Sequence, residues 1–383
     1  MAEQAQRQKR ARRGEVQAQQ AAPVPSEAVV AAVPSTTPSQ GELVQANADQ
    51  AQNNEPGITK LERLCAAPEH QGAGLTKADL NALLEHGIYC VETIAFMPAR
   101  KLTEVQGIGE AKAKRIITAA RQLVPMRMVS AAEMLQMRRN MVQLTTGSST
   151  LDALLGGGVE TGQITEIFGE FRCGKTQLCH TLCVGCQLPI DRGGAESKAL
   201  YIDTEGTFRP ERVRQIAEGK GVSAEAAMDN IVYARCYTSE HLVQLLVEAA
   251  SLMVSDEDRF ALVIVDSIMG VFRVDYSGRG ELSERQQHLG KVMSKLQKMS
   301  EEFNVAVVLT NQVMADPGGG CAFMPSHPKP VGGHILAHFS TTRVFLRKGR
   351  AEQRVAKIFD SPWLPESECV FEIYGGGVRN GSD

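Results

Sequence analysis

Apolar positions along the chain follow two different spacings. Between residues 57 and 125 they recur three or four positions apart, as in Leu80, Leu83 and Leu84, which is the period of an amphipathic helix. This part therefore predicts a small all-α module. After a short connector that starts at Pro125, apolar runs and helical stretches alternate to the C-terminus. Such alternation is typical of a mainly parallel sheet with helices on both faces, an α/β fold.

Eight apolar runs are the candidate strands of that sheet. Runs that are apolar throughout suit strands buried on both faces, and they lie at residues 164–168, 199–202, 231–233, 261–265 and 305–309. Later runs predict added antiparallel strands, at residues 342–346, 354–359 and 369–374.

The N-terminal segment lacks such a pattern. It is rich in Ala, Gln, Pro and Ser, which bury too little apolar surface to offset chain entropy, so we predict a disordered tail. Its basic run, Lys9, Arg10, Arg12 and Arg13, suggests a nuclear address or a nonspecific nucleic-acid contact, and a solubilising cluster is the alternative. The predicted domains are a tail at 1–56, a helical module at 57–125, a linker at 126–143 and an α/β core at 144–383.

Composition limits the class of protein further. The 383 residues carry 41 Lys and Arg against 44 Asp and Glu, a net charge of -3, so any nucleic-acid site must concentrate its basic residues locally. Nine cysteines, an odd number without a regular framework, fit a reducing compartment. Without an apolar signal segment or membrane span, we expect a chain that is neither exported nor integral to a membrane, and a nuclear location.

A glycine-rich segment directly follows the first predicted strand of the core. It fits the G-x-x-x-x-G-K-[ST] pattern with Gly169, Glu170, Phe171, Arg172, Cys173, Gly174, Lys175 and Thr176, and a helical stretch with Gln177 comes next. Backbone N–H groups of such a loop bind phosphate, the lysine adds charge and the threonine binds Mg²⁺. We predict that these residues bind ATP and Mg²⁺.

Polar residues at the ends of other predicted strands complete this site. Asp266 is expected to bind magnesium together with Thr176. Glu205 is the candidate base that orients the attacking water, and a cap on the following helix is the alternative. Gln312 is placed to contact the γ-phosphate. Glu205, Lys175 and Gln312 are the predicted catalytic residues.

Two long segments follow strands at the same edge and are predicted to be DNA-binding loops. The first, residues 272–282, carries Arg273 and Arg279, and the second, residues 313–333, is rich in glycine. Guanidinium groups on such loops suit phosphate binding without base readout. Surface loops with incidental arginines are the alternative reading.

Two further motifs have competing interpretations. Residues 106–109, with Lys112 behind them, resemble a helix-hairpin-helix turn that binds DNA phosphate through backbone N–H groups, or a plain αα-turn in an interaction module. Cys183 and Cys186, near Cys179 and His180, suggest metal or redox chemistry, but without a second cysteine pair we favour packing against the sheet.

Taken together, four segments resemble the eukaryotic RecA-like DNA strand-exchange recombinases. They lie at residues 169–176, 201–212, 275–282 and 310–313. The resemblance runs from about residue 57 to residue 383 and implies a RecA-like P-loop ATPase core after a helix-hairpin-helix domain. Residues 266–275, 284–287 and 315–318 are most similar to the meiosis-specific member, and the general repair recombinase comes next.

This resemblance implies an ATP-dependent recombinase that forms filaments on single-stranded DNA and exchanges strands with homologous duplex, aided by mediator proteins. It assigns Arg212 to the adenine, Asp360 and Pro362 to the nucleotide of the neighbouring subunit, and His338 to a relay of nucleotide state. It also implies DNA contacts from the two loops and from a basic strip, at Arg273, Arg279, Val313, Asp316, Pro317, Gly332, Gly333, Arg343, Arg347, Lys348 and Arg350.

The chain departs from the family pattern at three places. The polymerisation anchor, usually Phe-x-x-Ala, reads Met128 to Ala131 here, and methionine specifies geometry less well than an aromatic ring. Cys173 replaces a threonine and introduces thiol sensitivity, and Phe339 replaces a small residue. A hexameric RecA-fold helicase and a non-polymerising regulatory paralogue are the alternatives to a recombinase.

Overall fold

A computed structural model describes most of the chain after the N-terminal tail. The described residues are Leu61, Leu64, 75–124, 128–255, 259–278, 280–314 and 329–381. The predictions for the tail, its basic run, Arg279, Asp316 and Pro317 lie outside them. Among the described helices, none combines the length and the apolar character that a membrane crossing requires.

The module before the linker is entirely helical where it is described, as predicted. Its helices are α4 (Lys77–Glu85), α5 (Val91–Phe96), α6 (Ala99–Leu102) and α7 (Glu110–Leu123). Leu83, Ile94 and Ile116 are fully buried in one common core. Thr76 and Asp79 form a capping box at the start of α4, which satisfies backbone N–H groups that would otherwise lack partners.

The connector contains a helix that the hydrophobic pattern did not predict. Helix α8 (Ala131–Met137) begins with a capping box between Ser130 and Glu133, and the 3₁₀ turn η1 (Arg138–Asn140) follows. No residue of α8 is buried, and the Met128 side chain just before it is 100% exposed. The helix therefore exists through its cap and local propensity, without a packed face.

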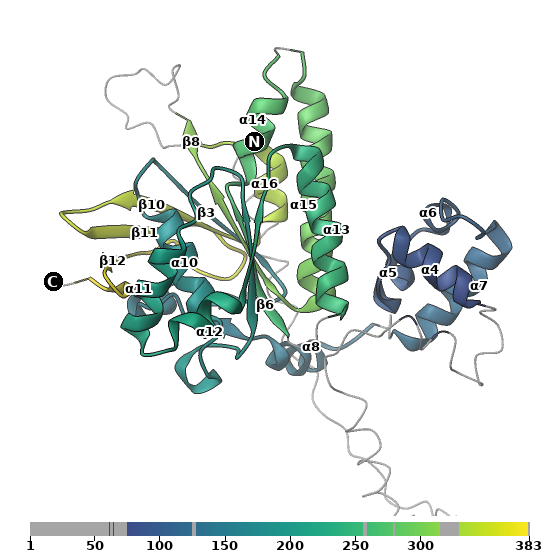
Figure 1. The fold of residues 1–383 in the computed structure, drawn as a ribbon, viewed down its shortest axis with the longest axis horizontal. Coiled ribbons are helices and arrows are strands. Elements are labelled where there is room, and N and C mark those ends of the chain that lie inside the picture. Colours follow the sequence, from purple (N-terminus) through teal and green to yellow (C-terminus); the bar gives the residue numbers. More distant parts are fainter. Residues whose placement is uncertain are drawn as a thin grey trace, which may run out of the picture. The chain divides into compact units, whose positions relative to one another are not determined.

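The core is built on a nine-stranded sheet in the order β13-β12-β11-β10-β3-β7-β6-β4-β5 (Figure 1). The five predicted strands are confirmed as β3 (Ile164–Gly169), β4 (Lys198–Asp203), β5 (Ile231–Arg235), β6 (Phe260–Asp266) and β7 (Ala306–Asn311), but β5 lies at the edge of the sheet with only Ile231 buried, so it is not the buried strand that was predicted. All neighbouring pairs among them are parallel.

The C-terminal strands differ from the prediction in one respect. They are β10 (Thr342–Lys348), β11 (Gln353–Asp360), β12 (Glu368–Tyr374) and β13 (Gly377–Asn380). Strand β10 pairs parallel with β3 and antiparallel with β11, so it extends the parallel sheet and only the last three strands are antiparallel additions. Strand β13 was not predicted. A strand of four residues is too short to show a hydrophobic period.

Helices cover both faces of the sheet, and each layer has its own apolar core (Figure 1). One layer contains α10 (Lys175–Gly185), α11 (Pro210–Lys220) and α12 (Ala224–Asp229). The other contains α13 (Ser239–Ser255), α14 (Ile268–Asp275), α15 (Leu282–Phe303) and α16 (Gly333–Phe339). Short elements join these layers: β1 (Gln143–Leu144), α9 (Ser149–Leu154), β2 (Val159–Glu160), η2 (Ile190–Arg192), β8 (Val313–Met314) and β9 (Lys329–Pro330).

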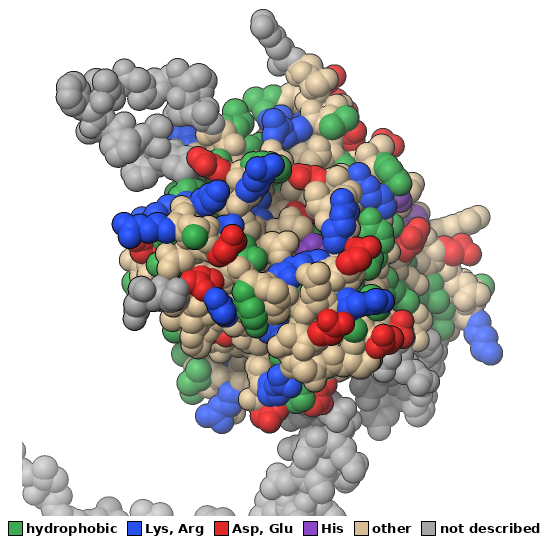
Figure 2. Space-filling model, turned by 60° about the vertical axis from the view of Figure 1, so that its left-hand side comes forward, with side chains coloured by type: hydrophobic (Ala, Val, Ile, Leu, Met, Phe, Trp, Pro, Cys, Tyr) green, Lys and Arg blue, Asp and Glu red, His purple; other side chains and the backbone are tan. Residues whose placement is uncertain are grey.

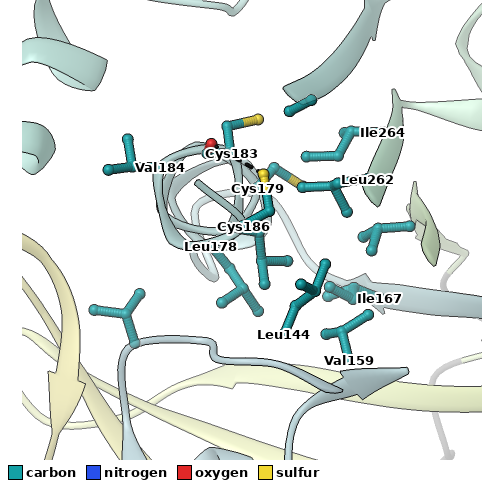
Figure 3. Close-up of a cluster of buried hydrophobic side chains, with 14 of the residues drawn as sticks. Leu144, Val159, Ile167, Leu178, Cys179, Cys183, Val184, Cys186, Leu262 and Ile264 are labelled. Carbon is teal, nitrogen blue, oxygen red and sulfur yellow. Dashed lines mark hydrogen bonds between the residues drawn. The ribbon is translucent and has the colours of Figure 1, made fainter. Parts of the chain in front are cut away.

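The cysteine cluster is part of this packing. Cys179, Cys183 and Cys186 lie on α10 or at its end among Leu178, Ile167 and Leu262 (Figure 3), and all three thiols are fully buried. Burial raises the pKa of Cys186 to about 12. No group of metal-binding side chains occurs among the described residues. The packing interpretation therefore fits the structure, and the redox interpretation does not, because thiolates are disfavoured here.

Candidate nucleotide and DNA site

The glycine-rich segment forms a loop between β3 and α10. Gly174 has φ of +101° directly before the first turn of α10, a conformation that side chains disfavour. A side chain at Gly169 would lie 2.1 Å from the carbonyl oxygen of Leu346. The Lys175 ammonium donates to the carbonyl oxygens of Gly169 and Glu170, both at 2.9 Å. The loop thus holds its lysine inside the turn that would receive a phosphate.

Asp266 connects three strands at the carboxyl edge of the sheet. Thr176 Oγ1 donates to Asp266 Oδ2 at 2.8 Å, and the Tyr201 hydroxyl donates to the same oxygen at 2.7 Å. Thr310 Oγ1 donates to Oδ1. Hydroxyl and carboxylate oxygens at this edge are the hard ligands that Mg²⁺ prefers, so Thr176 and Asp266 fit the predicted metal-binding role. The hydrogen bonds from Tyr201 and Thr310 to Asp266 were not predicted, because neither residue belongs to the glycine-rich motif.

Glu205 is oriented from two sides. Ser267 Oγ donates to Glu205 Oε1 at 2.6 Å, and Gln312 Nε2 donates to the same oxygen at 3.1 Å. Helix α11 has no side-chain cap, so the alternative role of Glu205 as a cap is wrong. The buried Asp203 organises this turn instead, because its Oδ1 accepts from the N–H groups of Glu205 and Gly206.

The first predicted DNA loop is shorter than expected. Helix α14 extends to Asp275 and α15 starts at Leu282, so Phe272 and Arg273 are helical and only residues 276–281 connect the helices. Buried Phe272 anchors the end of α14. Arg273 is exposed, and its Nη1 donates to Gln312 Oε1 at 2.7 Å. One arginine of this segment therefore lies within hydrogen-bond reach of the predicted γ-phosphate sensor.

The second predicted DNA loop has an ordered base. Its ends pair as strands β8 and β9, and Asn311 Nδ2 donates to the carbonyl oxygen of Val331 at 2.6 Å. Gly332 and Gly333 have φ of +102° and +66° and start α16, where exposed His338 lies in the last turn. Residues 315–328 lie outside the described part of the chain.

A cavity of about 780 Å³ brings most predicted nucleotide residues together. Its walls come from the glycine-rich loop, the ends of β4, β6 and β7, and the C-terminal strands. The lining residues are Gly169, Glu170, Phe171, Arg172, Gly174, Lys175, Thr176, Gln177, Glu205, Thr207, Arg212, Asp266, Ser267, Gln312, Val313, Arg354, Ile373, Tyr374 and Gly375. Predicted residues Asp360 and Pro362 do not line it, and neither does Cys173.

Arg212 closes one side of the cavity with a fixed guanidinium. Its Nε donates to Gln177 Oε1 at 2.7 Å, and its Nη atoms donate to the carbonyl oxygens of Gly375 and Tyr374 at 2.5 and 2.6 Å. Burial lowers the pKa of Arg212. These bonds hold the planar group in place, and a planar cation is suited to stacking on a base.

Two predictions from the departures and the basic strip need correction. Cys173 is buried and burial raises the pKa of its thiol, which disfavours the predicted thiol sensitivity. Arg343 is only 5% exposed. Its Nε donates to Glu166 Oε2 at 2.7 Å, and its guanidinium lies 5.5 Å from the ring centroids of both Phe168 and Phe359. Arg343 therefore forms a buried ion pair within the core and is not exposed for contact with duplex DNA in this structure.

The rest of the basic strip is exposed. Arg347, Lys348 and Arg350 point to solvent, although Arg347 also forms an ion pair with Glu368 at 3.2 Å. The side of the core that carries β10 and β11 comes forward in Figure 2, where Lys and Arg side chains surround a hollow with Asp and Glu side chains between them. The exposed basic groups of the strip are therefore Arg347, Lys348 and Arg350.

The helical module has an open turn before α7. No atom lies within 4 Å of the position that a side chain would take at Gly107 or Gly109, so a phosphate can approach this backbone closely. Lys112, by contrast, forms an ion pair with Asp79 at 2.6 Å. The Lys112 ammonium is thus paired within the module, and the phosphate contact predicted for this turn rests on its backbone N–H groups.

His180 behind the cavity is neutral. Its Nε2 accepts from the N–H of Arg209 at 3.2 Å, so the proton lies on Nδ1, 2.7 Å from the Thr176 carbonyl oxygen. Burial lowers its pKa, consistent with this tautomer. Both ring nitrogens are engaged, and the residue connects α10 to the turn before α11.

Together, the mostly parallel sheet, the glycine-rich loop and the strand-edge carboxylates define an α/β ATPase of the RecA type. The Rad51 family model matches residues 137–381, and a SAM-like helix-hairpin-helix tandem matches residues 73–122. The chain belongs to the Rad51 family, whose members are DNA-dependent ATPases with strand-exchange activity.

Similar relatives include proteins from fungi and plants. "DNA repair protein RAD51" of Saccharomyces cerevisiae is 54% identical over 305 residues, which cover 80% of this chain and 76% of the relative. "DNA repair protein rhp51" of Schizosaccharomyces pombe is 54% identical over 308 residues, 80% of this chain and 84% of the relative. "DNA repair protein RAD51 homolog B" of Zea mays is 52% identical over 313 residues, which cover 82% of this chain and 92% of the relative. These similarities favour the general repair recombinase over the meiosis-specific member.

Proposed function

We propose that this protein is a general homologous-recombination recombinase that assembles on single-stranded DNA in an ATP-dependent manner and exchanges strands with homologous duplex. The observation that carries the proposal is the cavity where the loop lysine, Asp266, Glu205 and Gln312 meet, in a chain similar to RAD51 repair proteins over most of its length. A role confined to meiosis is the second candidate, supported by the likeness at residues 266–275, 284–287 and 315–318.

The proposed mechanism assigns ATP hydrolysis to the chain's own groups. Backbone N–H groups from Gly174 onward and Lys175 hold the phosphates, and Thr176 with Asp266 would hold Mg²⁺, which supplies charge neutralisation when bound. Glu205 accepts the proton of the attacking water. Ser267 and Gln312 fix the carboxylate of Glu205, which favours one productive orientation.

DNA binding is assigned to the two predicted segments, to part of the basic strip and to the turn before α7. Arg273 and Arg279 belong to the first segment, and Val313, Asp316, Pro317, Gly332 and Gly333 to the second. The exposed residues Arg347 and Lys348 extend the surface toward duplex DNA, and the turn at Gly107 and Gly109 gives a further phosphate contact. Base pairing between strands, rather than side chains, reads the sequence.

Self-assembly is assigned to the segment before α8. Met128 and Ala131 would insert into the core of the next subunit, and full exposure of Met128 leaves its side chain available. Asp360 and Pro362 stay assigned to a neighbouring subunit's nucleotide, which fits their absence from this cavity's lining. Mediator proteins, a nuclear location and the domain limits given above complete the proposal.

Electron microscopy of the protein with ATP and single-stranded DNA tests the proposal. We expect helical filaments. Closed rings would support the helicase alternative, and small complexes would support the regulatory paralogue. To separate general from meiotic use, sensitivity of dividing, non-meiotic cells to DNA double-strand breaks should rise when the protein is depleted; unchanged sensitivity would favour the meiotic role.

A further inference from the structure

Arg354 brings a buried positive charge to the wall of the cavity. It lies at the start of β11, beside Phe371 of β12 and Lys348 of β10. The residue is only 9% exposed, yet it lines the same cavity as Lys175 and Thr176. A side chain built at Gly174 would lie 3.7 Å from Arg354 Cγ and 3.8 Å from its Nε. The arginine therefore packs directly beside the glycine-rich loop.

The hydrogen-bonding capacity of this guanidinium is only partly used. Nη1 donates to the carbonyl oxygens of Ala351 and Gln353, at 3.2 and 2.7 Å. Nε is buried without a partner, and Nη2 donates to no described residue. No carboxylate in the described part of the chain forms an ion pair with Arg354. A buried cation without a counter-charge is costly, so an anion is expected to complete its environment.

We propose that Arg354 is a nucleotide ligand, which binds the polyphosphate of the nucleotide from the side of Gly174. This inference rests on the proposed nucleotide site and adds a residue that no phosphate-loop motif contains. The contact would not involve the hydrolytic end, because Glu205 and Gln312 bond to each other on the side of Ser267 and Arg354 packs against Gly174. Arg354 would therefore bind ADP and ATP alike.

Titration of the full-length protein with fluorescent ADP and with a slowly hydrolysed ATP analogue tests this role. Arg354→Gln should weaken both affinities by the same factor, about tenfold or more, as expected for the loss of a hydrogen bond to a charged group. The nucleotide affinities of Arg354→Lys should lie between those of Arg354→Gln and those of the wild type. Arg192→Gln is the matched control, because Arg192 is exposed and does not line the cavity.

Two outcomes would overturn the proposal. One is a folded Arg354→Gln protein that binds ADP as tightly as the wild type. The other is measured on wild-type protein labelled with [¹⁵N]arginine, in which the Nε–H signal of Arg354 is the one missing from the spectrum of Arg354→Lys. The proposal predicts that this signal shifts when ADP is added, and a signal that does not shift would overturn it. If wild-type protein bound neither nucleotide, the proposed function itself would fail, whereas binding lost in Lys175→Ala and unchanged in Arg354→Gln would reject only this inference.

Discussion

Gln312 Nε2 donates a hydrogen bond to Glu205 Oε1 over 3.1 Å. The bond joins the end of β7, where the second predicted DNA segment begins, to the carboxylate proposed to activate water. Arg273 bonds to the other end of the same amide. Gln312 thus lies between a proposed DNA contact and the proposed base, an arrangement that allows DNA binding to influence hydrolysis.

Glu205→Gln should abolish hydrolysis while nucleotide binding persists. The amide keeps the size of the carboxylate but cannot accept a proton, so the turnover rate should fall by about 10² to 10⁴. Phosphate release and nucleotide titration on the same preparation measure the two quantities. A variant that hydrolyses ATP at the wild-type rate would exclude Glu205 as the base.

Gln312→Ala should uncouple hydrolysis from DNA. Without the amide, neither Arg273 nor the second segment is linked to Glu205, so the ratio of DNA-stimulated to basal ATPase rate should approach one. The matched control is Gln297→Ala. The Gln297 side chain is exposed on α15 and donates to Glu301, so this variant should retain full stimulation. Stimulation that survives in Gln312→Ala would show that the coupling takes another route.

Arg273→Ala should weaken binding to single-stranded DNA. One lost phosphate contact lowers the slope of log affinity against log salt concentration by about 0.7. Titrations of labelled single strands at several salt concentrations measure this slope. An unchanged slope would place Arg273 outside the DNA interface and leave only its bond to Gln312.

Arg343→Met should destabilise the core. The substitution leaves the Glu166 carboxylate buried without its partner, since the two side chains are 6% and 0% exposed, and breaking such a pair typically costs about 3–5 kcal/mol. Denaturant unfolding measures the loss of free energy of unfolding.

Arg347→Gln is the exposed counterpart. It removes the ion pair with Glu368, which should lower the free energy of unfolding by at most about 1 kcal/mol, and it should weaken duplex binding. Equal stability losses in both variants would contradict the buried role of Arg343.

Asp79→Asn should destabilise the helical module in a pH-dependent way. Burial alone would raise the pKa of Asp79, but hydrogen bonds from Lys112 and Thr76 outweigh burial and lower it from 3.8 to about 2. A carboxyl with a lowered pKa contributes stability above its unfolded pKa and loses that contribution as pH falls through the folded value. The deficit of the variant should therefore be full at pH 7 and shrink between about pH 4 and pH 2 in unfolding experiments. A deficit that stays constant to pH 2 would contradict the ion pair.

The sequence allowed the central site to be predicted because its chemistry is encoded locally. The glycine-rich loop follows a buried strand, and parallel strands bring their carboxyl ends to one edge, so the sequence alone predicts that Asp266, Glu205 and Gln312 lie close together. Helix α8 was missed for a different reason. Its cap, Ser130 with Glu133, is a recognisable signal, but the helix lacks the apolar stripe on which the prediction relied.

The remaining differences depend on contacts between distant residues. Arg343 looks like surface charge in a basic stretch, and only the pairing of β10 with β3 places it against Glu166, 177 positions earlier. Likewise, Arg354 meets the phosphate loop because β11 and β12 extend the sheet beside Gly174. The local period of apolar residues predicts neither the direction of a strand nor such long-range pairing between strands.

The central claim is that ATP bound in this cavity drives homologous strand exchange, and a strand-exchange assay tests it most directly. With ATP, the wild-type protein should form joint molecules between a single strand and homologous duplex, and none with unrelated duplex. Lys175→Ala should form none with either. Unwinding of duplex without pairing, or exchange that proceeds normally in Lys175→Ala, would contradict the account.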